Sequence, residues 1–212
     1  ITKVSFCTLT LDQQRVYNDL LADSRRKVGD LVSAKGFDRA RFEILAILMR
    51  LRQACCHLDL LKEHHRPGAY EAPSAKLDAF LELLDEAVDG GHRILVFSQF
   101  VSMLKLLREE LERRSHSYCY LDGSTQDRLQ QCQRFNLNPD IPVFLISLKA
   151  GGTGLNLTGA DMVVHFDPWW NPAVEDQATD RAHRIGQKRT VYSIKMIAEH
   201  TVEEKVLDMQ RR

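Results

Sequence analysis

Two different spacings of apolar residues divide the chain. Between residues 11 and 57 apolar side chains recur every three or four positions, separated by charged ones, as in amphipathic helices. The recurring positions include Ile44, Leu45, Leu48 and Leu51. Residues 66–73 then bring in Pro and Gly, which interrupt regular backbone structure. We therefore predict a helical segment over residues 1–70 and a second domain over residues 71–212.

Short apolar runs rich in branched residues follow, and stretches long enough for a helix separate them. The runs are Ile94–Phe97, Tyr118–Leu121, Val143–Ile146, Met162–Phe166 and Val191–Ile197. Ser74 is a good N-cap for a helix over Leu77–Val88, and a second helix is predicted over Gln99–Arg114. This alternation predicts an α/β fold in three layers, with functional loops at the carboxyl ends of parallel strands.

Composition narrows the classes of partner and compartment. The 212 residues carry 29 Lys plus Arg and 29 Asp plus Glu, so no overall positive field attracts a polyanion. No apolar run approaches the ~20 residues of a membrane span, so we expect no membrane association. Five irregularly spaced cysteines indicate reduced thiols and an intracellular protein. Because the first residue is Ile1, we expect the sequence to be part of a longer protein.

A glycine-rich stretch follows the predicted strand Val143–Ile146. It reads Ser147-Leu148-Lys149-Ala150-Gly151-Gly152-Thr153-Gly154-Leu155-Asn156. Glycines let backbone N–H groups approach a phosphate closely, and Ser147, Lys149 and Thr153 add donors. A tight turn between strand and helix explains the glycines equally well. The stretch is not a Walker A loop, since Gly-Lys-Ser/Thr occurs nowhere in the chain.

A second candidate is the arginine pair Arg181 and Arg184. Residues three apart project from the same side of a helix, so the two guanidinium groups could clamp one anion. Ion pairing within the helix, with Asp176 or Asp180, is the alternative.

Resemblance decides between these alternatives. Gln177-x-x-Asp180-Arg181-x-x-Arg184 resembles the final helicase motif of superfamily-two ATPases, and its extension through Gln187 resembles the version in SWI/SNF-type DNA translocases. Four further blocks match the same family in order: Arg93–Phe100, Leu121–Thr125, the glycine stretch and Asp167–Pro172. The resemblance covers essentially the whole chain as the C-terminal RecA-like lobe of such a motor, preceded by the family's helical protrusion.

This resemblance implies an ATPase built from two lobes. ATP and Mg²⁺ would be held mainly by an N-terminal lobe, where Walker A and B lie, so the present chain alone should be inactive. Arg181 and Arg184 would act as arginine fingers positioned by Gln177, and Gly154 and Asn156 would lie near the nucleotide. We expect no metal site in this chain, because the spacings of Cys55, Cys56 and the nearby histidines do not suit zinc.

The same resemblance implies contacts to the backbone of double-stranded DNA. The residues concerned are Ser98, Gln99, Gly123, Ser124, Ser147, Lys149 and Thr153. Such contacts position a protein without reading sequence, which suits a translocase related to chromatin remodellers. The expected location is the nucleus, or the cytoplasm and nucleoid of a bacterium. Two alternatives stay open: a non-catalytic module that docks on DNA or protein, and the C-terminal lobe of an RNA-unwinding ATPase. In the latter the motif usually has Gly in place of Asp180.

Overall fold

The computed structural model describes residues 1–61, 68–151 and 154–212, and within them one parallel sheet forms the centre of the molecule. Its strands are β1 (Thr2–Cys7), β2 (Ile94–Ser98), β3 (Tyr118–Leu121), β4 (Val143–Ser147), β5 (Met162–His165) and β6 (Tyr192–Ala198). They lie in the order β1-β6-β5-β2-β4-β3, and each pairing is parallel. Every residue of β2, β4 and β5 is buried, which explains why these strands read as continuous apolar runs.

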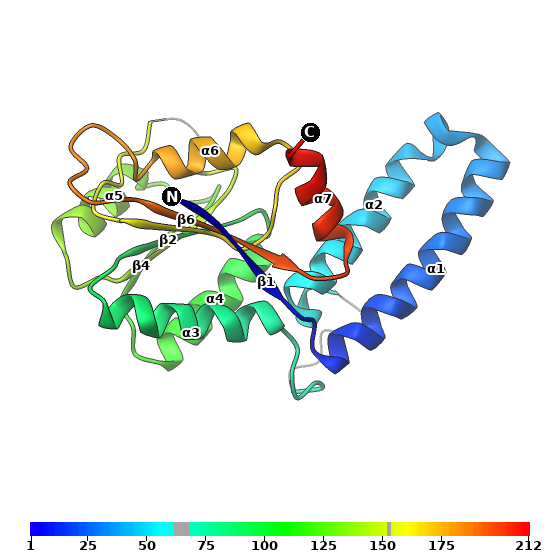
Figure 1. Ribbon diagram of the computed structural model, residues 1–212, viewed down its shortest axis with the longest axis horizontal. Coiled ribbons are helices and arrows are strands. Elements are labelled where there is room, and N and C mark those ends of the chain that lie inside the picture. The colour runs from blue at the N-terminus through cyan, green and yellow to red at the C-terminus, as the bar shows by residue number, and fades with distance from the viewer. Residues whose placement is uncertain (62–67, 152–153) are drawn as a thin grey trace.

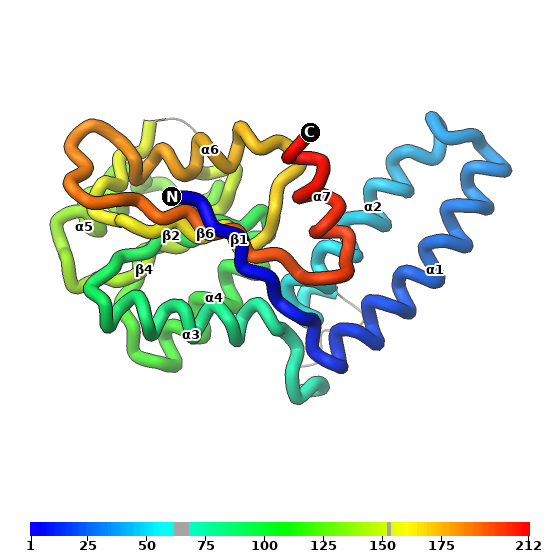
Figure 2. Tube along the Cα trace, in the orientation of Figure 1, coloured from blue at the N-terminus to red at the C-terminus, as the bar shows by residue number. Residues whose placement is uncertain are grey.

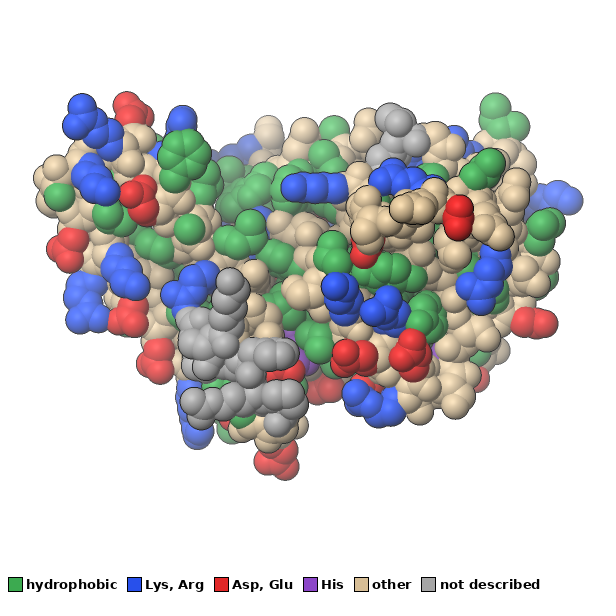
Figure 3. All heavy atoms as spheres, turned by 180° about the vertical axis from the view of Figure 1, so that it is seen from behind, with side chains coloured by type: hydrophobic (Ala, Val, Ile, Leu, Met, Phe, Trp, Pro, Cys, Tyr) green, Lys and Arg blue, Asp and Glu red, His purple; other side chains and the backbone are tan. Residues whose placement is uncertain are grey.

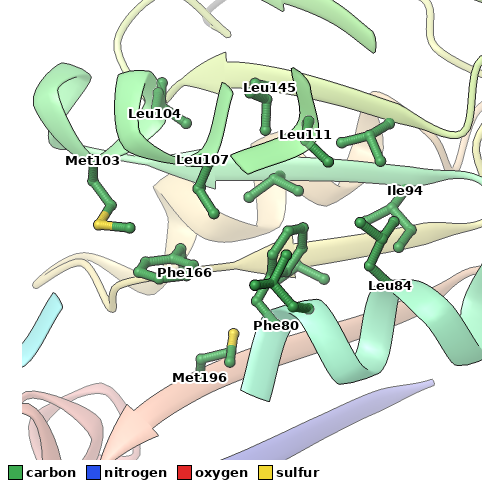
Figure 4. Close-up of a cluster of buried hydrophobic side chains, with 14 of the residues drawn as sticks. Phe80, Leu84, Ile94, Met103, Leu104, Leu107, Leu111, Leu145, Phe166 and Met196 are labelled. Atoms are coloured by element: carbon green, nitrogen blue, oxygen red, sulfur yellow. The ribbon is translucent and has the colours of Figure 1, made fainter. Parts of the chain in front are cut away.

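Helices cover both faces of this sheet, which confirms the predicted α/β fold. On one face lie α3 (Ala75–Asp89) and α4 (Val101–Arg113), and on the other α5 (Arg128–Leu137) and α6 (Pro172–Asp180) (Figure 1). Figure 4 shows Phe80 and Leu84 of α3 and Leu107 of α4 packed against Phe166 and strand residues. Ser74 caps α3 as predicted, since its side chain accepts the N–H of Leu77 at 3.0 Å.

The N-terminal part of the chain forms a helical hairpin that projects from the body. Its helices α1 (Leu11–Lys35) and α2 (Phe37–Cys56) lie side by side (Figure 2). They meet at Gly36, whose φ of +77° favours glycine. A short 3-10 turn, Leu58–Leu60, follows α2. The predicted break begins at Arg66 and Pro67, which lie outside the described residues.

The first strand departs from the predicted division of the chain at residue 70. Residues Thr2–Cys7, assigned above to the helical segment, pair with β6 and form an edge of the sheet. Their mixed burial gives a weak signal, because only Cys7 of this edge strand is fully covered. The sheet-containing body therefore includes chain from both sides of the helical hairpin.

A buried ion pair links α3 to the last helix of the chain. Lys76, on α3, lies 2.6 Å from Glu203 on α7 (Val202–Gln210) and donates to the carbonyl of Phe166 at 2.7 Å. Burial opposes the charge on Lys76, but Glu203, together with Cys56 and Asp167, raises the pKa of the ammonium group above its usual value. In the described parts of the chain, no helix is both long and apolar enough to cross a bilayer.

Candidate functional site

The carboxyl ends of β2, β3 and β4 bring most of the predicted DNA-binding residues to one edge of the sheet. Ser98 and Ser147 are register partners on the neighbouring strands β2 and β4. Leu121, the last residue of β3, is the partner of Ile146 in β4. The loops that carry Gln99, Ser124 and Lys149 therefore leave the sheet at nearly the same level.

Ser98 and Ser147 themselves are buried and use their hydroxyl groups internally. The Ser98 hydroxyl donates to Asp167, whose other carboxylate oxygen accepts the N–H of Gln99 at 3.2 Å. The Ser147 oxygen accepts the N–H of Ala150 at 3.2 Å. In this structure both serines brace loops rather than face solvent, and a direct DNA contact by either one stays a prediction.

The loop after β3 presents Gly123 and Ser124 to solvent around a buried carboxylate. Asp122 accepts both the N–H of Ser124, at 2.8 Å, and its hydroxyl, at 2.6 Å. The Ser124 hydroxyl is the main reason that the pKa of Asp122 lies below its usual value. Because the carboxylate fixes the turn, the exposed backbone of this loop is preorganised.

Gln99 and Lys149 line a largely apolar pocket of about 530 Å³ between α2 and the body. Its other lining residues are Met49, Gln53, Phe100, Leu148, Trp169 and Val174. The side-chain Nε2 of Gln99 is buried and has no hydrogen-bond partner among the described residues, whereas Lys149 is exposed. Seen from behind, hydrophobic side chains gather in the hollow between the helical hairpin and the body (Figure 3). This pocket gives the sheet edge one unused amide donor.

The glycine stretch runs from the end of β4 towards the end of α6. Gly151 packs so closely on Phe97 that an added Cβ would lie 2.7 Å from its ring. Gly154 is exposed with a φ of +88°, while Gly152 and Thr153 lie outside the described residues. Asn156 is exposed, and its carbonyl accepts the amide of Asn136 at 2.8 Å. Close packing and the positive φ explain two of the glycines without any ligand.

The arginine pair lies at and beyond the end of α6 rather than within it. The helix ends at Asp180, Arg181 lies in the turn that follows and Arg184 in a bend, so the two arginines are not part of one regular helix. Arg181 is 4 % exposed, while Gln177 and Arg184 are exposed. Pro172 is the first residue of α6. Just beyond the other end of this helix, the N–H groups of Ala182 and His183 both donate to the carbonyl of Thr179.

The electrostatics of the pair favour an added anion. Burial, and then the charge of Arg184, lower the pKa of Arg181, although Asp180 acts in the opposite sense. The Nε of Arg181 is buried and has no hydrogen-bond partner within the described ranges. Neither arginine forms an ion pair within 4.0 Å among those residues, so intrahelical pairing does not occupy them.

A backbone hydrogen bond joins the residue after the glycine stretch to residues 181–187, here called the arginine turn. The N–H of Leu157 donates to the carbonyl of Arg181 at 2.9 Å. The side chain of Gln187 reaches the same region, as described below. The two motifs that the sequence analysis treated separately therefore form one surface on the α5 and α6 side of the sheet (Figure 1).

Three residues that organise the site were not among the predicted site residues: Asp167, Arg52 and Gln187. A signal existed for Asp167, because it follows β5 and Ser98 ends the adjacent β2, so the two were bound to be neighbours. Arg52 donates to the carbonyl of Pro168 at 2.5 Å, across a separation that no local pattern encodes. Gln187 ends the motif that resembles the SWI/SNF version, but the sequence does not show that its side chain contacts three carbonyls.

A metal site in this lobe would need His, Cys, Asp or Glu side chains grouped together among the described residues. Those residues contain no group of three or more His, Cys, Asp or Glu that could hold an ion. Cys55 and Cys56 are buried in the core, and burial raises the pKa of both thiols. Two of the nearby histidines, His64 and His65, lie outside the described residues.

Comparison with known proteins shows which family the chain resembles over most of its length. Residues 75–186 match the family model for the helicase conserved C-terminal domain. The chain is 39 % identical over 204 residues to the putative ATP-dependent helicase/translocase YwqA of Bacillus subtilis, covering 95 % of this chain and 22 % of that protein. It is also 39 % identical over 213 residues to Protein CHROMATIN REMODELING 8 of Arabidopsis thaliana, covering 98 % of this chain and 17 % of the relative.

A solved structure extends the comparison to three dimensions. The Sulfolobus solfataricus SWI2/SNF2 ATPase core in complex with dsDNA superposes with a TM-score of 0.81 at 33 % identity, covering 98 % of this chain and 43 % of that one. The chain spans less than a quarter of the two curated relatives above. Fold, motif order and identity together place the chain in the SWI2/SNF2 family of ATP-dependent helicases, as a helicase C-terminal domain.

Proposed function

We propose that this chain is the second motor lobe of an ATP-dependent translocase on double-stranded DNA. Arg181 and Arg184 would contact the phosphates of ATP as arginine fingers, with Gln177 positioning them. The observation that carries this proposal is the buried Nε of Arg181, which lacks a partner among the described residues while a second guanidinium lies three residues on. A phosphate oxygen would satisfy the orphaned donor and offset the repulsion between two like charges.

The nucleotide itself would be bound mainly by a preceding N-terminal lobe. This chain has no Gly-Lys-Ser/Thr loop, and its described residues offer no ligand cluster for Mg²⁺. The ion would therefore reach the site on the phosphates and on the other lobe, where it supplies charge neutralisation. Gly154 and Asn156 are exposed beside the arginine turn and would face the nucleotide. We expect the chain alone to hydrolyse essentially no ATP.

DNA would be held at the carboxyl edge of the sheet. Gly123, Ser124 and Lys149 are exposed there, and the unpartnered Nε2 of Gln99 points to a missing acceptor. Ser98 and Ser147 would support this surface from beneath, and Thr153 extends the prediction into the glycine stretch. Contacts of this kind grip the DNA backbone without choosing a sequence. Closure of the two lobes on ATP would then alternate with release to give a step.

An Arg184→Ala variant of the full-length protein tests the finger role. Hydrolysis should fall by about 10³-fold or more, while ATP binding stays within a few-fold, because the other lobe holds most of the phosphate contacts. Arg184→Lys should recover only part of the rate, since an ammonium group cannot reproduce the planar fork. Arg113→Ala, which removes an exposed arginine elsewhere in the lobe, is the matched control and should leave the rate unchanged.

The opposite result has a clear meaning. If Arg184→Ala keeps its turnover per folded molecule and instead lowers the melting temperature, the arginine is structural and the lobe is not the source of the fingers. A module that only docks on DNA or protein would then explain the chain better.

A further inference from the structure

Gln187 joins the arginine turn to the segment between the glycine stretch and β5 through a single amide group. Its Nε2 lies 3.0 Å from the carbonyl of Thr158, 2.7 Å from that of Ala160 and 3.0 Å from that of Ala182. Ala182 lies within the arginine turn, whereas Thr158 and Ala160 precede β5. The Gln187 side chain therefore bridges the arginine turn and the segment that precedes β5.

The remaining atoms of Gln187 are also engaged. Its Oε1 accepts the N–H of Arg189 at 3.0 Å, and its own N–H donates to the carbonyl of Arg184 at 3.0 Å. An amide group suits this place because it offers donors to the carbonyls on one side and an acceptor to an N–H on the other. A carboxylate would place negative charge against three carbonyl oxygens, and an apolar side chain would remove the side-chain partner of these carbonyls and of the Arg189 N–H.

Two further contacts hold the turn on either side of Gln187. The N–H of Leu157 donates to the carbonyl of Arg181 at 2.9 Å. Downstream, Arg189 donates to the carbonyl of Gly91 at 2.9 Å and lies 3.2 Å from Asp161. Gln187 is the central contact of the three, and the only one of them that bonds both the arginine turn and the segment before β5 through its side chain.

We propose that Gln187 is a positioning residue that fixes the arginine turn relative to the segment between the glycine stretch and β5. This inference rests on the proposed function of Arg181 and Arg184. The side chain of Gln187 holds the carbonyl of Ala182, between the two arginines, while its backbone N–H donates to the carbonyl of Arg184. Together these bonds would set the direction of both guanidinium groups.

Steady-state ATPase measurements on the full-length protein test this role with the Gln187→Glu and Gln187→Leu variants. Both should lower kcat between about tenfold and hundredfold, the scale expected when catalytic groups are misplaced by about 1 Å. The KM for ATP should change by less than about threefold, because the phosphates are held mainly by the other lobe. Gln130→Glu, on the exposed side of α5, makes the same charge change without these contacts and should behave like the wild type.

The pH profile separates positioning from simple loss of stability. Protonation of the new carboxyl group in Gln187→Glu restores one donor, so its kcat relative to wild type should rise as pH falls, whereas Gln187→Leu should show no such recovery. A Gln187→Leu variant with wild-type kcat would overturn the proposal. So would a fall in kcat that disappears when the rate is corrected for the folded fraction.

Amide hydrogen exchange separates failure of this inference from failure of the finger proposal. Exchange at residues 181–187 should rise in Gln187→Leu, with β4 and β5 protected as in the wild type. If Arg184→Ala leaves hydrolysis intact, the finger proposal fails, but increased exchange would still show that Gln187 holds the turn. Unchanged exchange at residues 181–187 would overturn the role of Gln187 whatever Arg184 does.

Discussion

The guanidinium carbon of Arg52 lies 5.1 Å from the ring centroid of Trp170 and 5.7 Å from that of Trp169. Arg52 is 3 % exposed and belongs to α2, whereas the two tryptophans precede α6. This contact, with the hydrogen bond to Pro168, fastens the helical hairpin to the segment that leads into α6, the helix that precedes Arg181 and Arg184. The two tryptophans therefore have a packing role, since they hold the buried guanidinium group of Arg52.

Replacement of Arg52 by Ala should destabilise the fold by about 3 kcal/mol, because a buried charged hydrogen bond and a cation–π contact are lost together. For a chain of this length that corresponds to a fall in melting temperature of roughly 6–12 °C. Arg39→Ala, an exposed arginine on the same helix, is the control and should shift the midpoint by less than about 2 °C. Equal shifts for the two variants would contradict the proposed role of Arg52.

Lys76→Met should cost about 3–5 kcal/mol of unfolding free energy, since it leaves the Glu203 carboxylate buried without its cation. The double variant Lys76→Met/Glu203→Gln should lose clearly less than the sum of the single losses, because no uncompensated charge is then left in the core. Denaturant titrations of the four proteins in this cycle measure the coupling. Additive losses would show that the two side chains act independently despite their contact.

Stability should fall as the pH drops from 7 to 5, in part because of His165. Burial lowers the pKa of His165 to about 4, whereas an unfolded histidine titrates near pH 6.5. As the pH falls through this window the unfolded chain takes up the proton first, so His165 removes about 2 kcal/mol of stability by pH 5. A His165→Gln variant, which keeps a donor towards Thr179, should show a correspondingly flatter pH profile in urea titrations. Identical profiles would assign the effect to other groups.

Duplex DNA of any sequence should stimulate the ATPase of the full-length protein, and RNA should stimulate it poorly. Affinity should fall steeply with salt, and Lys149→Ala should weaken binding while reducing the slope of log K against log salt by about 1. Lys27→Ala, an exposed lysine on α1, is the matched control and should leave the slope unchanged. Equal stimulation by RNA at the same salt concentration would favour an RNA-unwinding ATPase.

Much of the body follows from local pattern alone. The central strands and the helices α3 and α4 lie within a few residues of their predicted bounds, because buried strands need continuous apolar runs and a capped helix needs a regular apolar stripe. The order of the motifs was equally visible, and it pointed to the family that the comparisons support. These features depend on neighbouring residues, so the sequence states them directly.

Only the tertiary structure determined the positions and contacts of the candidate site residues. The spacing of Arg181 and Arg184 suggested one helix, but the helix ends at Asp180, so one guanidinium is buried and the other exposed. Ser98 and Ser147 were expected to contact the DNA backbone, yet the Ser98 hydroxyl donates to Asp167 and the Ser147 oxygen accepts the N–H of Ala150. The edge strand Thr2–Cys7 and the contacts of Arg52 and Gln187 join residues far apart along the chain. Local periodicity cannot encode such pairings, because their energy arises only when the packed sheet brings both partners together.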